Sequence, residues 1–134
     1  MIGATTAVTD SSSRVAKAAD AANFRNIFHA AATIRKRSRA AIERAPKGAA
    51  STPGTPPHTH RGAFLKRAVL FFVDKQRNEA LIGFSGQLVG DVGAVHEFGQ
   101  TRRGRDYPQR PTLGPVLDAE ASRLGDQWRG SIGA

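Results

Sequence analysis

Two histidines in a proline-rich stretch offer the residue type from which a metal site is built. His58 and His60 stand two positions apart, and alternate residues of an extended chain share a side. Two imidazoles so placed can both reach one metal ion. No Asp or Glu stands beside them to complete a ligand set. We therefore expect polar loop histidines that contact a neighbouring surface, and no metal or cofactor.

A second group of polar residues suggests acid–base or nuclease chemistry. His96 and Glu97 are adjacent in the short apolar segment after Asp91, which we predict to be a strand. Adjacent residues of a strand point to opposite faces, so these two side chains would not form an acid–base pair. Asp91, Glu97 and Asp106 supply carboxylates for a magnesium-dependent nuclease, but their spacing matches no nuclease motif. We expect the arginines between them to pair with them, and we expect no enzymatic activity.

The third group is basic. Arg102, Arg103 and Arg105 stand in a predicted loop, residues 100–110, that ends at Arg110-Pro111. Guanidinium groups bind carboxylate and phosphate alike, so this loop is solvated, contacts a neighbouring subunit or contacts DNA. Tyr107 is the only nearby aromatic residue, which is too few for a base-stacking platform.

A further basic run lies in the predicted N-terminal helix and contains Arg35, Lys36 and Arg39. It is either a solvated face or a contact with DNA or an acidic partner. Over 134 residues, 20 Lys and Arg stand against 11 Asp and Glu, a net charge of +9. A field of that sign favours nucleic acid, an anionic membrane or an acidic protein surface.

Composition excludes several classes of protein. The absence of cysteine excludes disulfides and thiolate metal sites. No apolar run approaches the length of a bilayer span, and residues 1–13 lack the features of a signal peptide. We expect a protein made and used in a cytoplasm or built into a particle there, with no membrane contact.

The chain has the length of one domain, residues 1–134. Few helices and strands are therefore available to position the histidines, carboxylates and basic residues described above. Residues 1–10 are predicted to be a flexible arm. A helix then begins at Asp10 or at one of Ser11, Ser12 and Ser13, and ends before Pro46. Ser38 stands at the one step of its apolar stripe that lacks an apolar residue. The stripe consists of Val15, Ala19, Phe24, Ile27, Phe28, Ala31, Ile34, Ala41 and Ile42. A Pro-rich loop at 46–62 follows, and loops of this length usually bind something.

Residues 68–74 and 79–84 predict a β-hairpin that is apolar on both faces. Such a sheet requires cover on both sides, from its own helices or from another subunit. Thr112 is predicted to cap a final helix that packs across the sheet. The predicted fold class is α+β: a small antiparallel sheet packed with a long N-terminal helix and a C-terminal helix.

Three segments in this order resemble a known family. They are Pro53-Gly-Thr-Pro-Pro-His58 followed by Gly62-Ala-Phe-Leu-Lys-Arg67 and an apolar strand, Val92-Gly-Ala-Val-His-Glu-Phe-Gly99, and Tyr107-Pro-Gln-Arg-Pro-Thr-Leu-Gly-Pro-Val-Leu117. Together they resemble the neck and tail-completion proteins of tailed bacteriophages, including the virion morphogenesis proteins of Mu-like phages. The resemblance covers residues 24–129. One departure is Thr112, where the family commonly has an aromatic residue.

The resemblance implies a structural subunit of a homo-oligomeric ring, usually a hexamer, at the neck of the virion. The ring would complete the head-proximal end of the tail and join it to the head around a channel through which DNA passes. Its partners would be a neighbouring neck or head-closure ring and the tail-tube protein, with assembly in the host cytoplasm. A head-closure (stopper) ring and a basic DNA-binding module acting in packaging or regulation remain as alternatives.

Within that interpretation the candidate residues fall into two sets. The subunit-interface candidates are Pro56, Pro57, His58, His96, Glu97, Phe98, Tyr107, Arg110 and Pro111. The basic residues expected to face the lumen or a neighbouring ring are Arg102, Arg103, Arg105, Arg35, Lys36 and Arg39.

Overall fold

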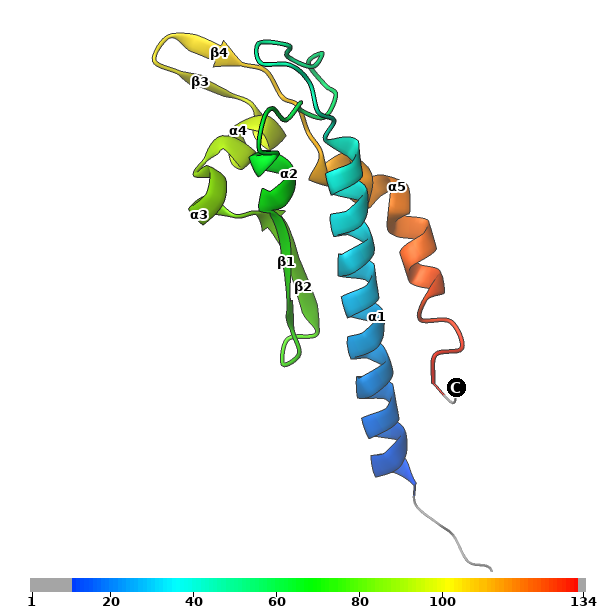
Figure 1. The fold of residues 1–134 in the computed structure, drawn as a ribbon. Coiled ribbons are helices and arrows are strands. Elements are labelled where there is room, and N and C mark those ends of the chain that lie inside the picture. The colour runs from blue at the N-terminus through cyan, green and yellow to red at the C-terminus, as the bar shows by residue number, and fades with distance from the viewer. Residues whose placement is uncertain (1–10, 133–134) are drawn as a thin grey trace, which may run out of the picture.

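The computed structural model describes residues 11–132, so the arm predicted for residues 1–10 lies outside the described residues. The fold is α+β, as predicted, with one long helix as its axis (Figure 1). The elements in chain order are α1 (Ser12–Ala41), α2 (Phe64–Ala68), β1 (Val69–Asp74), β2 (Glu79–Phe84), α3 (Gly86–Val89), α4 (Val92–Phe98), β3 (Gln100–Arg102), β4 (Arg105–Tyr107) and α5 (Leu113–Asp126).

Helix α1 confirms the predicted amphipathic helix. Its 30 residues correspond to about 45 Å of length. Ala31, Ile34 and Ser38 are buried at steps of three and four residues, which places them on one face. The small Ser38 fits where the stripe lacks an apolar side chain. The helix ends at Ala41, because Ile42 is already extended.

Strands β1 and β2 form the predicted antiparallel hairpin, in register from Val69 opposite Phe84 to Asp74 opposite Glu79. The Asp74 carboxylate accepts hydrogen bonds from the turn amides that follow it. One face of the hairpin packs on α1, where the Phe71 ring meets the Phe28 ring edge to face at 5.3 Å. At the far tip Lys75 lies over the Phe24 ring, 5.6 Å from its centre.

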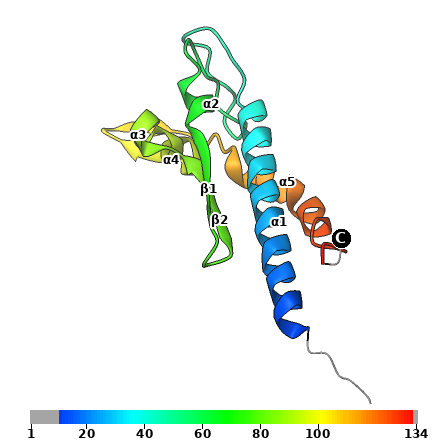
Figure 2. The same cartoon turned by 60° about the horizontal axis from the view of Figure 1, so that its bottom comes forward.

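Helix α1 lies between the hairpin and α5, and the two views in Figures 1 and 2 agree on this order. Helix α5 therefore packs on α1, where the Trp128 indole that follows it donates to the Asn23 side chain at 2.8 Å. The prediction that the last helix packs across the sheet is wrong for most of its length. Only its first residue, Leu113, reaches the core.

The main cluster of buried apolar side chains is small and lies at one end of the molecule, whereas Ala22, Ala31 and Ile34 are buried separately along α1. The fully packed residues of this cluster are Ile42, Leu65 and Val69. Half-buried side chains from β2, α3 and α5 surround them: Ile82, Phe84, Val89 and Leu113. The rest of the hairpin and of α1 extends away from this core, which leaves much of both elements at the surface.

Two predicted elements near the candidate site are wrong. The segment after Asp91 is helix α4 rather than a strand, and the predicted basic loop contains the hairpin β3–β4. Gly93 permits the close approach of α4 to β2, because a Cβ there would overlap the Cβ of Phe84. The glycine lets α4 lie directly on β2, and Gly99, at φ 68°, ends the helix.

Candidate assembly and recognition site

The Glu97 carboxylate holds the start of α5. It accepts hydrogen bonds from the backbone N–H groups of Thr112 (2.9 Å), Leu113 (3.1 Å) and Gly114 (2.8 Å). These are free amides at a helix N-terminus, where the helix dipole also favours a negative charge. Thr112 makes no capping bond and its buried Oγ1 has no partner in the described part of the chain. The prediction of a Thr112 cap is therefore wrong, and a residue of α4 performs that role.

Arg110 ties the corner before α5 to two other segments. Its backbone N–H donates to the carbonyl of His96 at 2.7 Å, and its Nε donates to the carbonyl of Ser51 at 3.0 Å. Close by, the backbone N–H of Gly54 donates to the carbonyl of Gln109 at 2.8 Å. The Pro-rich loop is thereby fixed against α4 and the Arg110-Pro111 corner.

These contacts border an open cavity of about 390 Å³ between the Pro-rich loop and α4. Four of the predicted interface residues, from three separate segments of the sequence, line its wall: Pro57, His58, His96 and Arg110. The remaining lining comes from Ala49, Ala50, Ser51, Thr59, His60, Arg61, Phe64, Leu65, Val89 and Val92. The wall contains no Asp or Glu.

The cavity histidines are held by backbone groups. The Nδ1 atom of His58 lies 2.9 Å from the carbonyl oxygen of Ala49, and that of His60 lies 3.1 Å from the carbonyl oxygen of Ala45. Among residues 11–132, no group of three or more His, Cys, Asp or Glu is placed to hold a metal ion. Burial, and then the positive charge of Arg110, lower the pKa of His96 below its usual 6.5.

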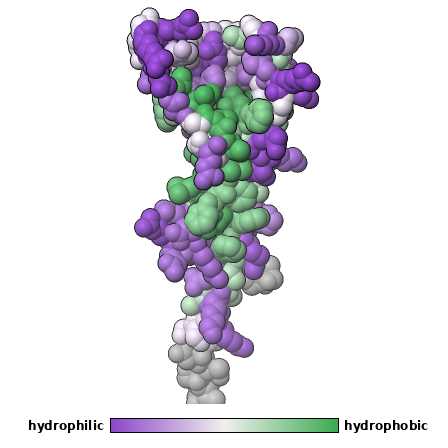
Figure 3. Space-filling view, turned by 60° about the vertical axis from the view of Figure 1, so that its left-hand side comes forward, coloured by the Kyte–Doolittle hydropathy of each residue, from purple (hydrophilic) through white to green (hydrophobic). Residues whose placement is uncertain are grey.

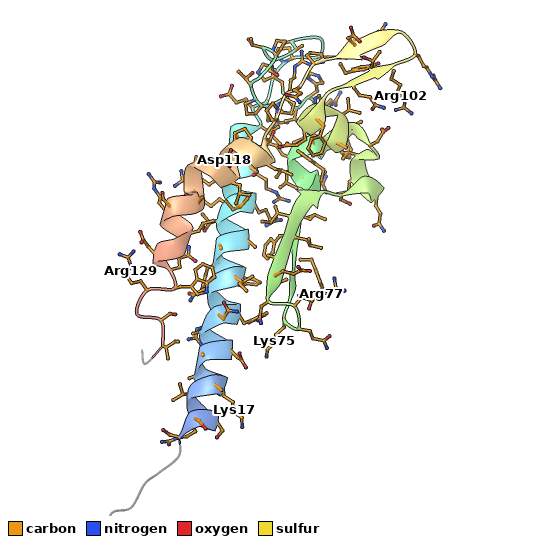
Figure 4. The ribbon with its side chains drawn as sticks, turned by 180° about the vertical axis from the view of Figure 1, so that it is seen from behind. Lys17, Lys75, Arg77, Arg102, Asp118 and Arg129 are labelled. Atoms are coloured by element: carbon orange, nitrogen blue, oxygen red, sulfur yellow. The ribbon has the colours of Figure 1, made fainter. Side chains whose placement is uncertain are left out.

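The hairpin β3–β4 projects from this end of the molecule (Figure 1), and all six of its residues are exposed. Arg103 and Gly104 form its turn with φ values of 53° and 73°. Arg102, labelled in Figure 4, pairs with Asp91 at 2.7 Å. Arg103 and Arg105 have no ion-pair partner among the described residues, so they present the uncompensated charge of this hairpin.

The three carboxylates considered for a nuclease do not converge. Asp91 pairs with Arg102, as expected from the intervening arginines. Asp106 instead accepts a hydrogen bond from the Thr101 hydroxyl at 2.6 Å, and Glu97 caps α5.

Most of the basic run in α1 is engaged within the subunit. The Nε of Arg35 donates to the carbonyl of Val69 at 3.2 Å, and a terminal nitrogen of Arg39 donates to the carbonyl of Arg67 at 3.1 Å. Burial, followed by the charges of Arg35 and Arg67, lowers the pKa of Arg39. Lys36 remains exposed.

The outward face of the β1–β2 hairpin is apolar and uncovered. Phe72 is 64% exposed and Leu81, its cross-strand partner, is 63% exposed. Leu70 is also exposed beside them. Figure 3 looks onto this side of the molecule and shows apolar surface along its middle beneath a polar end. We call Leu70, Phe72 and Leu81 the apolar sheet face.

Other predicted interface residues lie apart from this face. Phe98 and Tyr107 are exposed, and Pro111 is half-buried. Pro56 borders a separate groove with residues of α1 and α5. None of Leu70, Phe72 and Leu81 was among the predicted interface residues, although the apolar character of both hairpin faces was the signal that pointed to them.

The chain exposes more surface than a compact monomer. Its accessible surface is 9786 Å², whereas a compact protein of 14.3 kDa exposes about 6,800 Å². The twelve residues outside the described range account for at most about 1,700 Å², even as an extended chain. The remaining excess, at least about 1,300 Å², exceeds the roughly 800 Å² that each partner buries in a standard interface.

Comparison with protein-family models, with curated proteins and with solved structures gave no match. Within residues 11–132, no helix combines the length and the apolar character that crossing a membrane requires.

Proposed function

We propose that the protein is a ring-forming structural subunit of a tailed-phage neck, which completes the head-proximal end of the tail and joins it to the head. The observation that carries this proposal is the apolar sheet face. Phe72 and Leu81 are more than half exposed although they stand opposite one another in the centre of a hairpin. Large apolar side chains gathered in this way mark a protein–protein contact.

The shape of the subunit supports the same proposal. A small core at one end and a long extension of α1 with β1–β2 leave the hairpin covered on one side only. A second copy that packs on the apolar sheet face would supply the missing cover. The ordered resemblance of residues 24–129 to neck and tail-completion proteins supports the ring and its place in the virion.

Sizing by light scattering tests the proposal. We expect a mass above that of the 14.3 kDa monomer, either for the protein alone or after addition of the tail-tube protein. A monomer that persists under both conditions would overturn ring assembly.

A DNA-binding module is the second candidate, and the exposed, uncompensated Arg103 and Arg105 favour it. Binding to duplex DNA should then weaken steeply as salt rises, because each phosphate contact releases counterions. Replacing both arginines with Gln should lower the slope of log K against log salt by about two. A flat salt response would remove this candidate.

A further inference from the structure

The cavity between the Pro-rich loop and α4 has the form of a ligand pocket. Fixing the Pro-rich loop to the Arg110-Pro111 corner does not by itself require such a cavity. Its volume of about 390 Å³ falls within the range of about 300–1,000 Å³ typical of binding pockets. Phe64, Leu65 and Val92 give it an apolar wall, whereas His96 and Arg110 contribute polar groups. Convergent polar groups in an apolar pocket are the usual arrangement for selective binding.

The charge in the cavity is positive and uncompensated. The Arg110 guanidinium uses its Nε on the Ser51 carbonyl and has no ion-pair partner in the described structure. It is half-buried, and the cavity wall contains no Asp or Glu. A partly desolvated guanidinium with free N–H groups favours an anion, which it binds through charge-assisted hydrogen bonds.

The neighbouring imidazole limits the charge of the anion. His96 is held neutral near pH 7 by burial and by Arg110. Arg61 also lines the cavity but is exposed, so Arg110 is the one half-buried arginine in the wall. A single guanidinium matches a carboxylate, whereas a phosphate dianion would call for a second buried cation.

We propose that this cavity receives one carboxylate side chain, flanked by an apolar residue, from a segment of a partner protein. The carboxylate binds Arg110, and the apolar flank packs on Phe64 and Val92. The net charge of +9 makes an acidic partner surface the complementary one. The inference rests on the proposed function in one respect, that the subunit meets other proteins.

The test is an NMR titration of the free subunit with two capped peptides. One peptide is acetyl-Leu-Glu-Leu-amide and the other, acetyl-Leu-Gln-Leu-amide, differs only in lacking the carboxylate. We expect the glutamate peptide to cause saturable shifts at the amides of Ala50 and His96, with a millimolar dissociation constant. Equal shifts with the glutamine peptide, or no saturable shift, would overturn the proposal. Tighter binding of inorganic phosphate or of 3-phenylpropionate would overturn it in favour of a phosphate or a small-molecule acid.

Three variants locate the site. Arg110→Gln should weaken peptide binding about tenfold, the loss expected for one charge-assisted contact. Val92→Glu leaves Arg110 in place and should block binding, because it supplies a carboxylate from the subunit itself. Arg105→Gln removes an arginine of the β3–β4 hairpin and should leave binding unchanged. Equal weakening by Arg105→Gln, or full binding by Val92→Glu, would refute the assignment.

Light scattering on the same sample separates this inference from the proposed function. Ring assembly without peptide binding would remove only the pocket assignment. Peptide binding by a permanent monomer would remove only the ring.

Discussion

Replacing Glu97 with Ala removes the carboxylate that holds the N-terminus of α5. In the wild-type protein this side chain accepts three backbone hydrogen bonds, from Thr112, Leu113 and Gly114. Thr112 is fully buried, so its N–H would lose its partner without gaining water. Gly114 is exposed and its N–H can bond to solvent.

The expected cost follows from those surroundings. A hydrogen bond to a charged acceptor contributes about 1.5–3 kcal/mol, and loss of a helix N-cap costs about 0.5–2 kcal/mol. One stranded amide and two rehydrated amides together give a loss of roughly 2–4 kcal/mol in the free energy of unfolding. Glu97→Gln keeps one acceptor oxygen and should lose about half as much.

Urea unfolding monitored by circular dichroism measures both losses, at one protein concentration because assembly adds to the apparent stability. Glu79→Ala is the matched control, since Glu79 is exposed and its contact with Arg77 is a loose 3.7 Å ion pair. It should change stability by less than about 0.5 kcal/mol. A similarly small change for Glu97→Ala, or equal losses for the Gln and Ala variants, would refute the capping role.

Three further predictions concern the backbone and the pH response. Gly93→Ala should destabilise the fold by about 1–3 kcal/mol because its methyl group would overlap Phe84, whereas Gly86→Ala, which meets open space, should be tolerated. Arg103→Asn should stabilise the protein by roughly 0.5 kcal/mol in urea unfolding, because Asn adopts positive φ more readily than Arg at this turn. The lowered pKa of His96 means that the unfolded chain takes up its proton first, so stability should fall as the pH drops below about 6.5. Unfolding in urea across that range should show a weaker pH slope for His96→Gln, and an unchanged slope would contradict the assignment.

The sequence predicted the elements whose pattern is local. Helix α1 repeats apolar residues over many turns, and the β1–β2 hairpin combines β-branched and aromatic residues with a polar turn. Helix α4 could not be predicted in this way, because a seven-residue apolar segment suits a helix or a strand equally well. Its position on β2 depends on the fit of Gly93 against Phe84, a contact between residues in different elements. The turn Arg103-Gly104 lacks the Asn-Gly signal that marks a tight hairpin.

In the candidate site, too, contacts between residues distant in the sequence could not be predicted. The expectation that Glu97 and His96 point to opposite faces rested on a strand that is in fact helix α4. The partners that define the role of Glu97 lie 15 to 17 residues later. The meeting of His58, His96 and Arg110 at one cavity depends on how the Pro-rich loop folds back onto α4. Their side chains carried the chemical signal, and only the tertiary contacts bring them together.

The central claim is that subunits assemble through the apolar sheet face. The molar mass of one surface variant tests this claim most directly. Leu81→Lys places a charge at the middle of that face, whereas Leu117→Lys changes an exposed leucine of α5. Both variants should fold like the wild-type protein by circular dichroism, because neither side chain is buried.

Light scattering, either for the protein alone or after addition of the tail-tube protein, should show an assembly of about six 14.3 kDa subunits for the wild-type protein and for Leu117→Lys. It should give the mass of a monomer for Leu81→Lys. Assembly of Leu81→Lys to the wild-type mass, or a monomeric wild-type protein under both conditions, would contradict the claim.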